Sequence, residues 1–182
     1  MKQILFILCA LPSLAIAQNK NPYAYFKVEN NAAVFESVYD TTVSQAQLKQ
    51  LLLQMAMNLP HAINVQSNEN TITGAVNGAT YPHKQYGMAG MQTTAWFLYP
   101  VSFNFIIDVR DNKYRVKITS IAFDTKDLHS NIIGSSQSLE NALFRNNKFD
   151  WRTSARSVEN NTAFEHWLFD LFWVHPLNND NW

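Results

Sequence analysis

The chain contains two segments in which apolar residues recur with the spacing of an amphipathic α-helix. Ser44 and Gln47 open the first with the spacing of a capping box, and Pro60 stops it. This pattern predicts a helix over residues 44–59. The apolar stripes of the two segments are Leu48, Leu51, Leu52, Met55 and Leu59 in the first, and Phe164, Trp167, Leu168, Leu171 and Phe172 in the second.

The second stripe predicts a C-terminal helix that ends before His175 and Pro176. A weaker helical turn is expected in the segment between the two predicted helices. It rests on the spacing of Leu139, Ala142 and Leu143.

Alternating or β-branched stretches predict strands over residues 33–39, 62–66 and 71–76, and a long hairpin over residues 101–123. The hairpin turns at Asp111 and Asn112. An even-length loop keeps all apolar side chains on one face, because a slip of one residue turns every side chain to the other face. The expected cross-strand pairs are therefore Val109 with Tyr114, Ile107 with Val116, Phe105 with Ile118 and Asp108 with Arg115.

The element order predicts an α+β fold of two layers, an antiparallel sheet with two amphipathic helices packed on one face. We expect one domain over residues 33–176, preceded by a linker or N-terminal arm at 18–32 and followed by a polar tail at 177–182. Residues 77–99, between the predicted strands, are expected to form a long loop or an extended hairpin end. Loops of that length are either functional or disordered.

The first 17 residues have the organisation of a secretory signal peptide. Lys2 is the basic start, residues 4–11 are apolar, and Ala15-Ile16-Ala17 resembles a cleavage site. The only cysteine, Cys9, lies inside the apolar stretch, so cleavage leaves no thiol for a nucleophile, a metal or a disulfide. The pattern predicts export, to the periplasm or the extracellular space, without a transmembrane segment.

Composition narrows the function classes. Fourteen basic residues balance fourteen acidic ones, which removes the electrostatic basis of strong nucleic-acid binding. The five histidines do not form a metal-ligand motif. No dinucleotide, P-loop or serine-hydrolase motif is present either. We therefore expect no catalytic constellation, no cofactor and no metal.

The loop at 77–99 holds the candidate binding residues. Aromatic rings with neighbouring amide groups suit a glycan or peptide surface. The alternative is that the rings fill the core at the end of the sheet, which is the commoner role of aromatics. The candidates are Tyr81, His83, Tyr86, Trp96 and Tyr99.

Several segments resemble the family called domain of unknown function 4468. They are V-F-E-S-V-Y-D at 34–40, the S-x-x-x-L helix start at 44–48, I-T-G-A at 72–75, and F-I-I-D-V-R-D-N-K-Y-R-V-K-I-T-S-I at 105–121. The resemblance covers about residues 33–123. It implies a secreted Gram-negative protein with a curved sheet similar to that of the TATA-binding protein. No catalytic residue belongs to the family pattern, and the DNA binding of the fold's namesake does not transfer with the fold.

These observations predict a non-catalytic binding or interaction module of the bacterial cell envelope, whose partner is an envelope protein or a glycan. The alternative is a periplasmic hydrolase that uses His83 together with an acid from elsewhere in the chain.

The N-terminal pattern generates the first testable prediction. Export should remove residues 1–17, because the basic, apolar and small-residue segments stand in the order that signal peptidase requires. Mass spectrometry of the exported protein should find Gln18 at or near the N-terminus. An intact Met1 on the exported protein, or a lipid on Cys9, would contradict it.

Overall fold

A computed structural model describes residues 20–88, 93–126, 136–145 and 149–174 of the chain. The predicted signal peptide and the predicted tail at 177–182 lie outside these residues. Among the described helices, none is long and apolar enough to cross a membrane.

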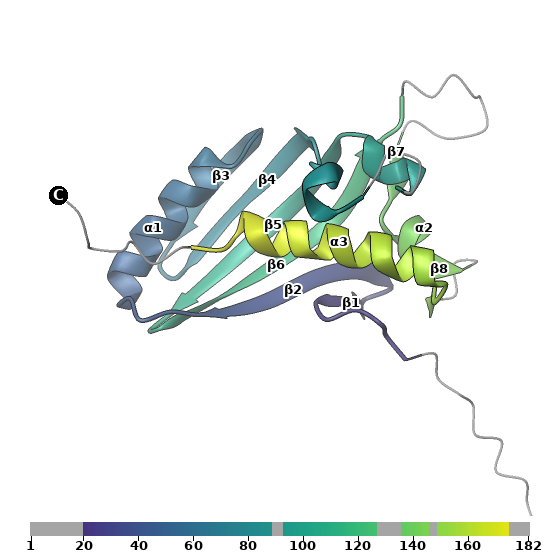
Figure 1. The fold of residues 1–182 in the computed structure, drawn as a ribbon. Helices are drawn as coiled ribbons and strands as arrows, with labels where there is room; N and C mark the ends of the chain where they lie inside the picture. Colours follow the sequence, from purple (N-terminus) through teal and green to yellow (C-terminus); the bar gives the residue numbers. More distant parts are fainter. Residues whose placement is uncertain (1–19, 89–92, 127–135, 146–148, 175–182) are drawn as a thin grey trace, which may run out of the picture.

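Seven of the described strands form one antiparallel sheet, in which six lie side by side in the order β1-β2-β6-β5-β4-β3 (Figure 1). β7 pairs with the end of β6, and β8 and β9 form a separate short ribbon. The strands are β1 (Phe26–Glu29), β2 (Ala32–Asp40), β3 (Ala62–Asn68), β4 (Thr71–Ala79), β5 (Val101–Arg110), β6 (Lys113–Asp124), β7 (Ser136–Ser138), β8 (Phe144–Arg145) and β9 (Asp150–Trp151).

The three described α-helices lie on the same face of the sheet (Figure 1). They are α1 (Gln45–Asn58), the single turn α2 (Glu140–Leu143) and α3 (Ala155–Leu171). α1 packs on β3, β4 and β5, whereas α2 and α3 both contact β2. The predicted two-layer α+β fold is therefore confirmed, and the weak helical turn near Leu139 is present as α2.

The central hairpin has the predicted register. Val109 pairs with Tyr114, Ile107 with Val116 and Phe105 with Ile118. Asp108 lies opposite Arg115 and accepts hydrogen bonds from its guanidinium at 2.6 and 3.1 Å. Both side chains are exposed to a large degree, so the pair has a small effect on the free energy of folding.

The start of α1 differs from the predicted capping box. Ser44 Oγ lies 3.1 Å from the side-chain oxygen of Gln47 and caps no backbone N–H. The N–H of Gln45 instead donates to Asp111 Oδ1 at 3.1 Å, from the turn between β5 and β6. A carboxylate from the hairpin thus replaces the local cap and docks the helix N-terminus on the sheet.

Of the two alternatives for residues 18–32, a linker or an N-terminal arm, the described residues 20–32 have the form of an arm that is docked on the sheet. Residues 26–29 form strand β1, which pairs with β2 at the edge of the sheet. Tyr23 and Phe26 are buried in the main core. The segment escaped prediction because its strand is short and its packing partners lie on α3, far away in the sequence.

The second predicted helix begins earlier than its apolar stripe. α3 starts after Ser154, whose Oγ accepts a hydrogen bond from the N–H of Ser157 at 3.3 Å. The polar first turns of α3 carry no apolar period, so only the second half of the helix was predicted. α3 ends at Leu171, and His175 lies outside the described residues.

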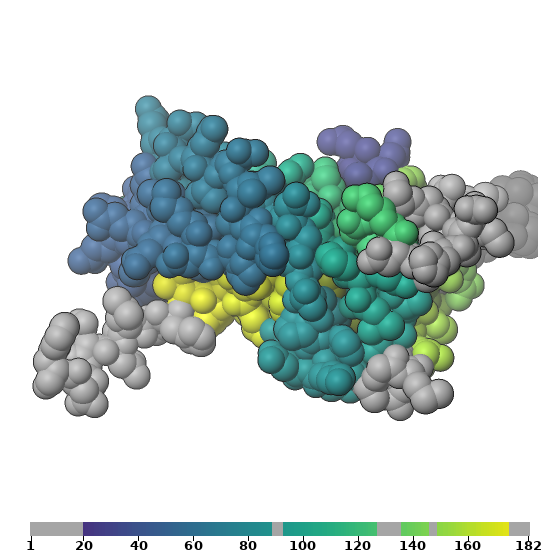
Figure 2. All heavy atoms as spheres, turned by 90° about the horizontal axis from the view of Figure 1, so that it is seen from above, coloured from purple at the N-terminus to yellow at the C-terminus, as the bar shows by residue number. Residues whose placement is uncertain are grey.

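The described residues of the expected long loop at 77–99 contain regular structure. β4 extends to Ala79, and two 3₁₀ turns follow, η1 (His83–Tyr86) and η2 (Ala95–Leu98). This connection, teal in Figure 2, projects beside the yellow helix α3. Gly87 ends η1 with a φ of 80°, a left-handed conformation that glycine adopts without steric cost.

Gly74 within the I-T-G-A segment has a packing role. A Cβ at this position would lie 2.5 Å from the ring of Phe105 on the neighbouring strand. The ring of Phe105 therefore covers the backbone of β4, and it also contacts Phe172 with ring centroids 5.4 Å apart. Glycine at this position therefore leaves the space that the ring of Phe105 occupies over β4.

The packing of the two long helices generates the second prediction. Leu52 is fully buried on α1, and Trp167 is 5% exposed on α3. Leu52→Ala and Trp167→Ala should each lower the free energy of unfolding by about 2–5 kcal/mol, because each leaves a cavity against the sheet. Denaturant midpoints measure the change.

Exposed residues on the same helical segments provide matched controls. Met57 is 59% exposed on α1, and Glu159 is exposed on α3. Their alanine variants should change the free energy of unfolding by less than about 1 kcal/mol. Equal effects at core and control positions would show that the helices are not docked as described.

Candidate functional site

The N-terminal arm is held by one buried carboxylate. Glu165 on α3 is 1% exposed. Its Oε1 accepts hydrogen bonds from the N–H groups of Tyr25 and Phe26 at 2.6 and 2.7 Å, and its Oε2 accepts from Ala24 at 3.3 Å. Burial raises the pKa of the carboxyl, and the three backbone donors oppose that shift.

The arm in turn positions a side chain of α3. Tyr23 Oη accepts a hydrogen bond from Asn161 Nδ2 at 2.7 Å and donates to the carbonyl of Arg152 at 3.4 Å. Burial raises the pKa of the Tyr23 hydroxyl, and the Asn161 donor partly offsets that shift. Tyr23 thereby joins the arm, β9 and α3 at one point.

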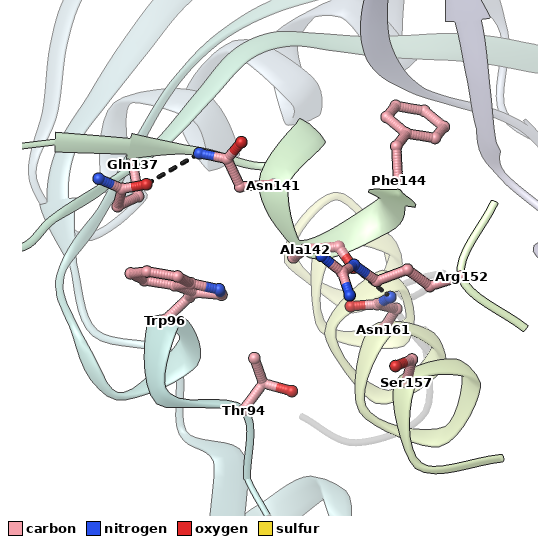
Figure 3. A pocket seen from close by; sticks show the side chains of 9 residues that line it. All are labelled: Thr94, Trp96, Gln137, Asn141, Ala142, Phe144, Arg152, Ser157 and Asn161. Atoms are coloured by element: carbon pink, nitrogen blue, oxygen red, sulfur yellow. Dashed lines mark hydrogen bonds between the residues drawn. The ribbon is translucent and has the colours of Figure 1, made fainter. Parts of the chain in front are cut away.

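A groove of about 460 Å³ lies next to this junction. Figure 3 shows its two walls. Thr94 and Trp96, at η2, form one wall, and residues of β7, α2, β8, the segment just after β9 and the first half of α3 form the other. The residues of the second wall are Gln137, Asn141, Ala142, Phe144, Arg152, Ser157 and Asn161.

Asn161 is the most tightly constrained residue of the groove. It is 1% exposed, and its Nδ2 donates both to Tyr23 Oη and, at 3.3 Å, to the carbonyl of Ala142. A carbonyl only accepts hydrogen bonds, so the amide nitrogen must face Ala142. The oxygen Oδ1 then points toward the open side of the groove (Figure 3), and among the described residues it accepts no hydrogen bond.

The groove contains one of the predicted binding residues. Trp96 is half-buried, and Figure 3 shows the nitrogen-bearing edge of its ring turned toward the space between the walls. The 3₁₀ turn that carries Trp96 is attached to α3 at its start, because the N–H of Thr94 donates to Asn160 Oδ1 at 2.8 Å. The structure thus separates Trp96 from the other aromatic candidates.

Tyr81 belongs to the core. It is 1% exposed and its ring packs on Phe97, Phe164 and Trp167, with centroids 5.3–5.9 Å away. Burial strongly raises the pKa of its hydroxyl. A residue in this position fits the alternative in which the rings fill the core, and not a recognition surface.

Tyr86 lies half-buried beside the C-terminal half of α3, where its hydroxyl donates to Asp170 Oδ2 at 2.9 Å. Burial and the Asp170 carboxylate raise its pKa to about 12. This contact fastens η1 to the helix. Tyr86 is not among the residues that line the groove.

His83 and Tyr99 are also half-buried outside the groove lining. The His83 ring lies 6.4 Å from that of Tyr81, and its side chain forms no hydrogen bond or ion pair with another described residue. A hydrolase centred on His83 needs an acid or a nucleophile beside it. The described neighbours do not supply one.

Sequence reasoning missed the other groove residues, from Gln137 to Asn161. Their signal was weak because they come from several short segments that no sequence motif links. Among the described residues, no cluster of three or more potential metal ligands is present.

Comparisons with known proteins place the fold in a class. The sheet with helices on one face is shared with a TBP-like protein from Parabacteroides distasonis ATCC 8503, with a TM-score of 0.53, 16% identity, and coverage of 80% of this chain and 94% of that one. The chain thus has a TBP-like fold, as the sequence resemblance implied.

A second solved structure bears on the family that the sequence resembles. The fold is similar to a DUF4468 family protein from Bacteroides ovatus ATCC 8483, with a TM-score of 0.51, 13% identity, and coverage of 84% of this chain and 93% of that one. At these identities the likeness concerns the fold. No family model and no curated protein matches the chain.

The clamp on the arm generates the third prediction. Glu165→Ala should lower the free energy of unfolding by about 2–4 kcal/mol, because it leaves buried backbone N–H groups without an acceptor. The arm around Tyr23 should also become sensitive to limited proteolysis. Glu159, exposed on the same helix, is the control, and Glu159→Ala should change neither property.

Proposed function

We propose that this protein is an exported, non-catalytic binding module of the bacterial cell envelope, and that its ligand site is the groove between η2 and the α2–α3 wall. The ligand is a glycan or a segment of an envelope protein. Export rests on the N-terminal pattern of residues 1–17. The bacterial sources of the two structures with the same fold agree with this setting.

One observation supports the site above all others. The groove combines a half-buried tryptophan with an asparagine acceptor whose position is set by two hydrogen bonds. Binding sites combine apolar surface with a small number of well-placed polar groups in this way. The pre-positioned Asn161 lowers the entropy that a ligand must otherwise lose on binding.

We propose a non-catalytic role because the described groove residues do not combine a nucleophile with a histidine or a carboxylate, as general acid–base or nucleophilic catalysis requires. Ser157 is the only serine of the lining, and its Oγ accepts a hydrogen bond from Ser154 Oγ at 2.7 Å. No histidine or carboxylate lines the groove beside it. The hydrolase alternative therefore has no described geometry in its favour.

The fourth prediction concerns capture of the native ligand. Trp96→Ala should weaken binding of envelope material by at least about 1 kcal/mol, since aromatic anchors in grooves carry much of the binding energy. Tyr86→Ala removes a comparable half-buried aromatic from the same connection outside the groove. It should leave binding unchanged, provided that melting temperatures show both variants folded.

A crosslinking experiment tests the site directly. A photo-reactive amino acid at Asn141, exposed on the rim of the groove, should form an adduct in the native envelope. The same group at Met57, exposed on the distant helix α1, is the control. Equal adducts at both positions, or undiminished capture by Trp96→Ala, would overturn the proposed site, and turnover lost in His83→Ala would favour a hydrolase.

A further inference from the structure

The polar groups of the groove differ in what they offer a ligand. Asn161 presents an acceptor, because both amide hydrogens are engaged by Tyr23 and Ala142. The arrangement is rigid, since Tyr23 is itself held by the arm that Glu165 clamps. A ligand atom that meets Oδ1 must therefore be a donor, such as a hydroxyl group.

The opposite wall offers donors. The indole N–H edge of Trp96 is turned into the space (Figure 3), and an indole nitrogen is a donor only. At one end of the groove, Asn141 Nδ2 donates to Gln137 Oε1 at 2.8 Å. This bond leaves the Gln137 amide hydrogens and the Asn141 carbonyl for other partners. The groove thus presents both donors and acceptors, which match the hydroxyl groups of a saccharide because each hydroxyl can donate and accept.

The charge of the groove is positive. Arg152 is the only charged side chain among its described lining residues, and no carboxylate is among them. The backbone of Arg152 is fixed on both sides, because its N–H donates to the Leu143 carbonyl at 2.7 Å and its carbonyl accepts from Tyr23. The guanidinium, on an exposed side chain, is then available for a ligand carboxylate, which it binds in a bidentate geometry.

We propose that the groove binds an acidic saccharide, with Arg152 paired to a sugar carboxylate while Asn161 and Trp96 bind sugar hydroxyl groups. This inference rests on the proposed function and specifies its ligand class. A neutral glycan satisfies the asparagine and the indole but leaves the guanidinium without a partner. A protein segment is the other ligand class that the binding experiment distinguishes.

The experiment compares a panel of acidic polysaccharides, each paired with its carboxyl-reduced neutral form, by titration against the purified protein. The acidic form should bind about tenfold more tightly than its neutral counterpart, as expected for one charge-assisted hydrogen-bonded pair. The difference should shrink as salt concentration rises, because the guanidinium is exposed to solvent.

Variants assign the preference to its residue. Arg152→Gln should abolish the difference between acidic and neutral forms, because it removes the guanidinium that pairs with the sugar carboxylate. Arg145→Gln is the matched control, because Arg145 is exposed on the adjacent strand β8, donates to Thr153 Oγ1 at 3.4 Å and does not line the groove. Trp96→Phe, which keeps a ring but removes the N–H, should weaken both forms equally.

Some outcomes overturn this inference without touching the proposed function. Equal binding of acidic and neutral forms, an unchanged preference in Arg152→Gln, or binding of peptides alone would each reject an acidic saccharide. The proposed binding site would survive if Trp96→Ala still reduced capture of envelope material. Failure of the whole panel to bind would also reject the inference.

Discussion

The carboxylate of Glu165 organises the region on which the candidate site depends. Its three backbone hydrogen bonds draw residues 24–26 onto α3 and align them as the start of an edge strand. Desolvation of a carboxylate is costly, so the contact persists only because each oxygen accepts backbone hydrogen bonds. The same clamp brings Tyr23 to Asn161, and a structural constraint thereby orients a group that faces the groove.

The connection between β4 and β5 has two structural roles. Tyr81 and Phe97 enter the core, where Phe97 stacks on Phe164 with centroids 4.7 Å apart. Trp96, adjacent in sequence to Phe97, turns to the groove instead. The aromatic content of the segment therefore reflects core packing by some rings and a place in the groove for the half-buried Trp96. The core contact of the adjacent Phe97 limits the conformations that the backbone at Trp96 can adopt before a ligand binds.

The predictable parts of the structure are those in which local pattern and tertiary burial agree. The register of the central hairpin followed from its alternation, and α1 followed from its apolar stripe and Pro60. Strand β1 could not be predicted, because its four residues carry no period and gain their order from Glu165, more than a hundred residues away in the chain. The true cap of α1, Asp111, is likewise a contact between distant residues.

By itself the sequence determined the fold class, the pairing of the central strands and an N-terminal segment with the pattern of export. Each of these depends on residues that are close in sequence, where periodicity and turn chemistry suffice. The tertiary structure decided which aromatic residues are core and which face a groove, and that Arg152 and Asn161 stand on the wall opposite Trp96. These side chains come from separate segments, so only the packing of those segments creates a site.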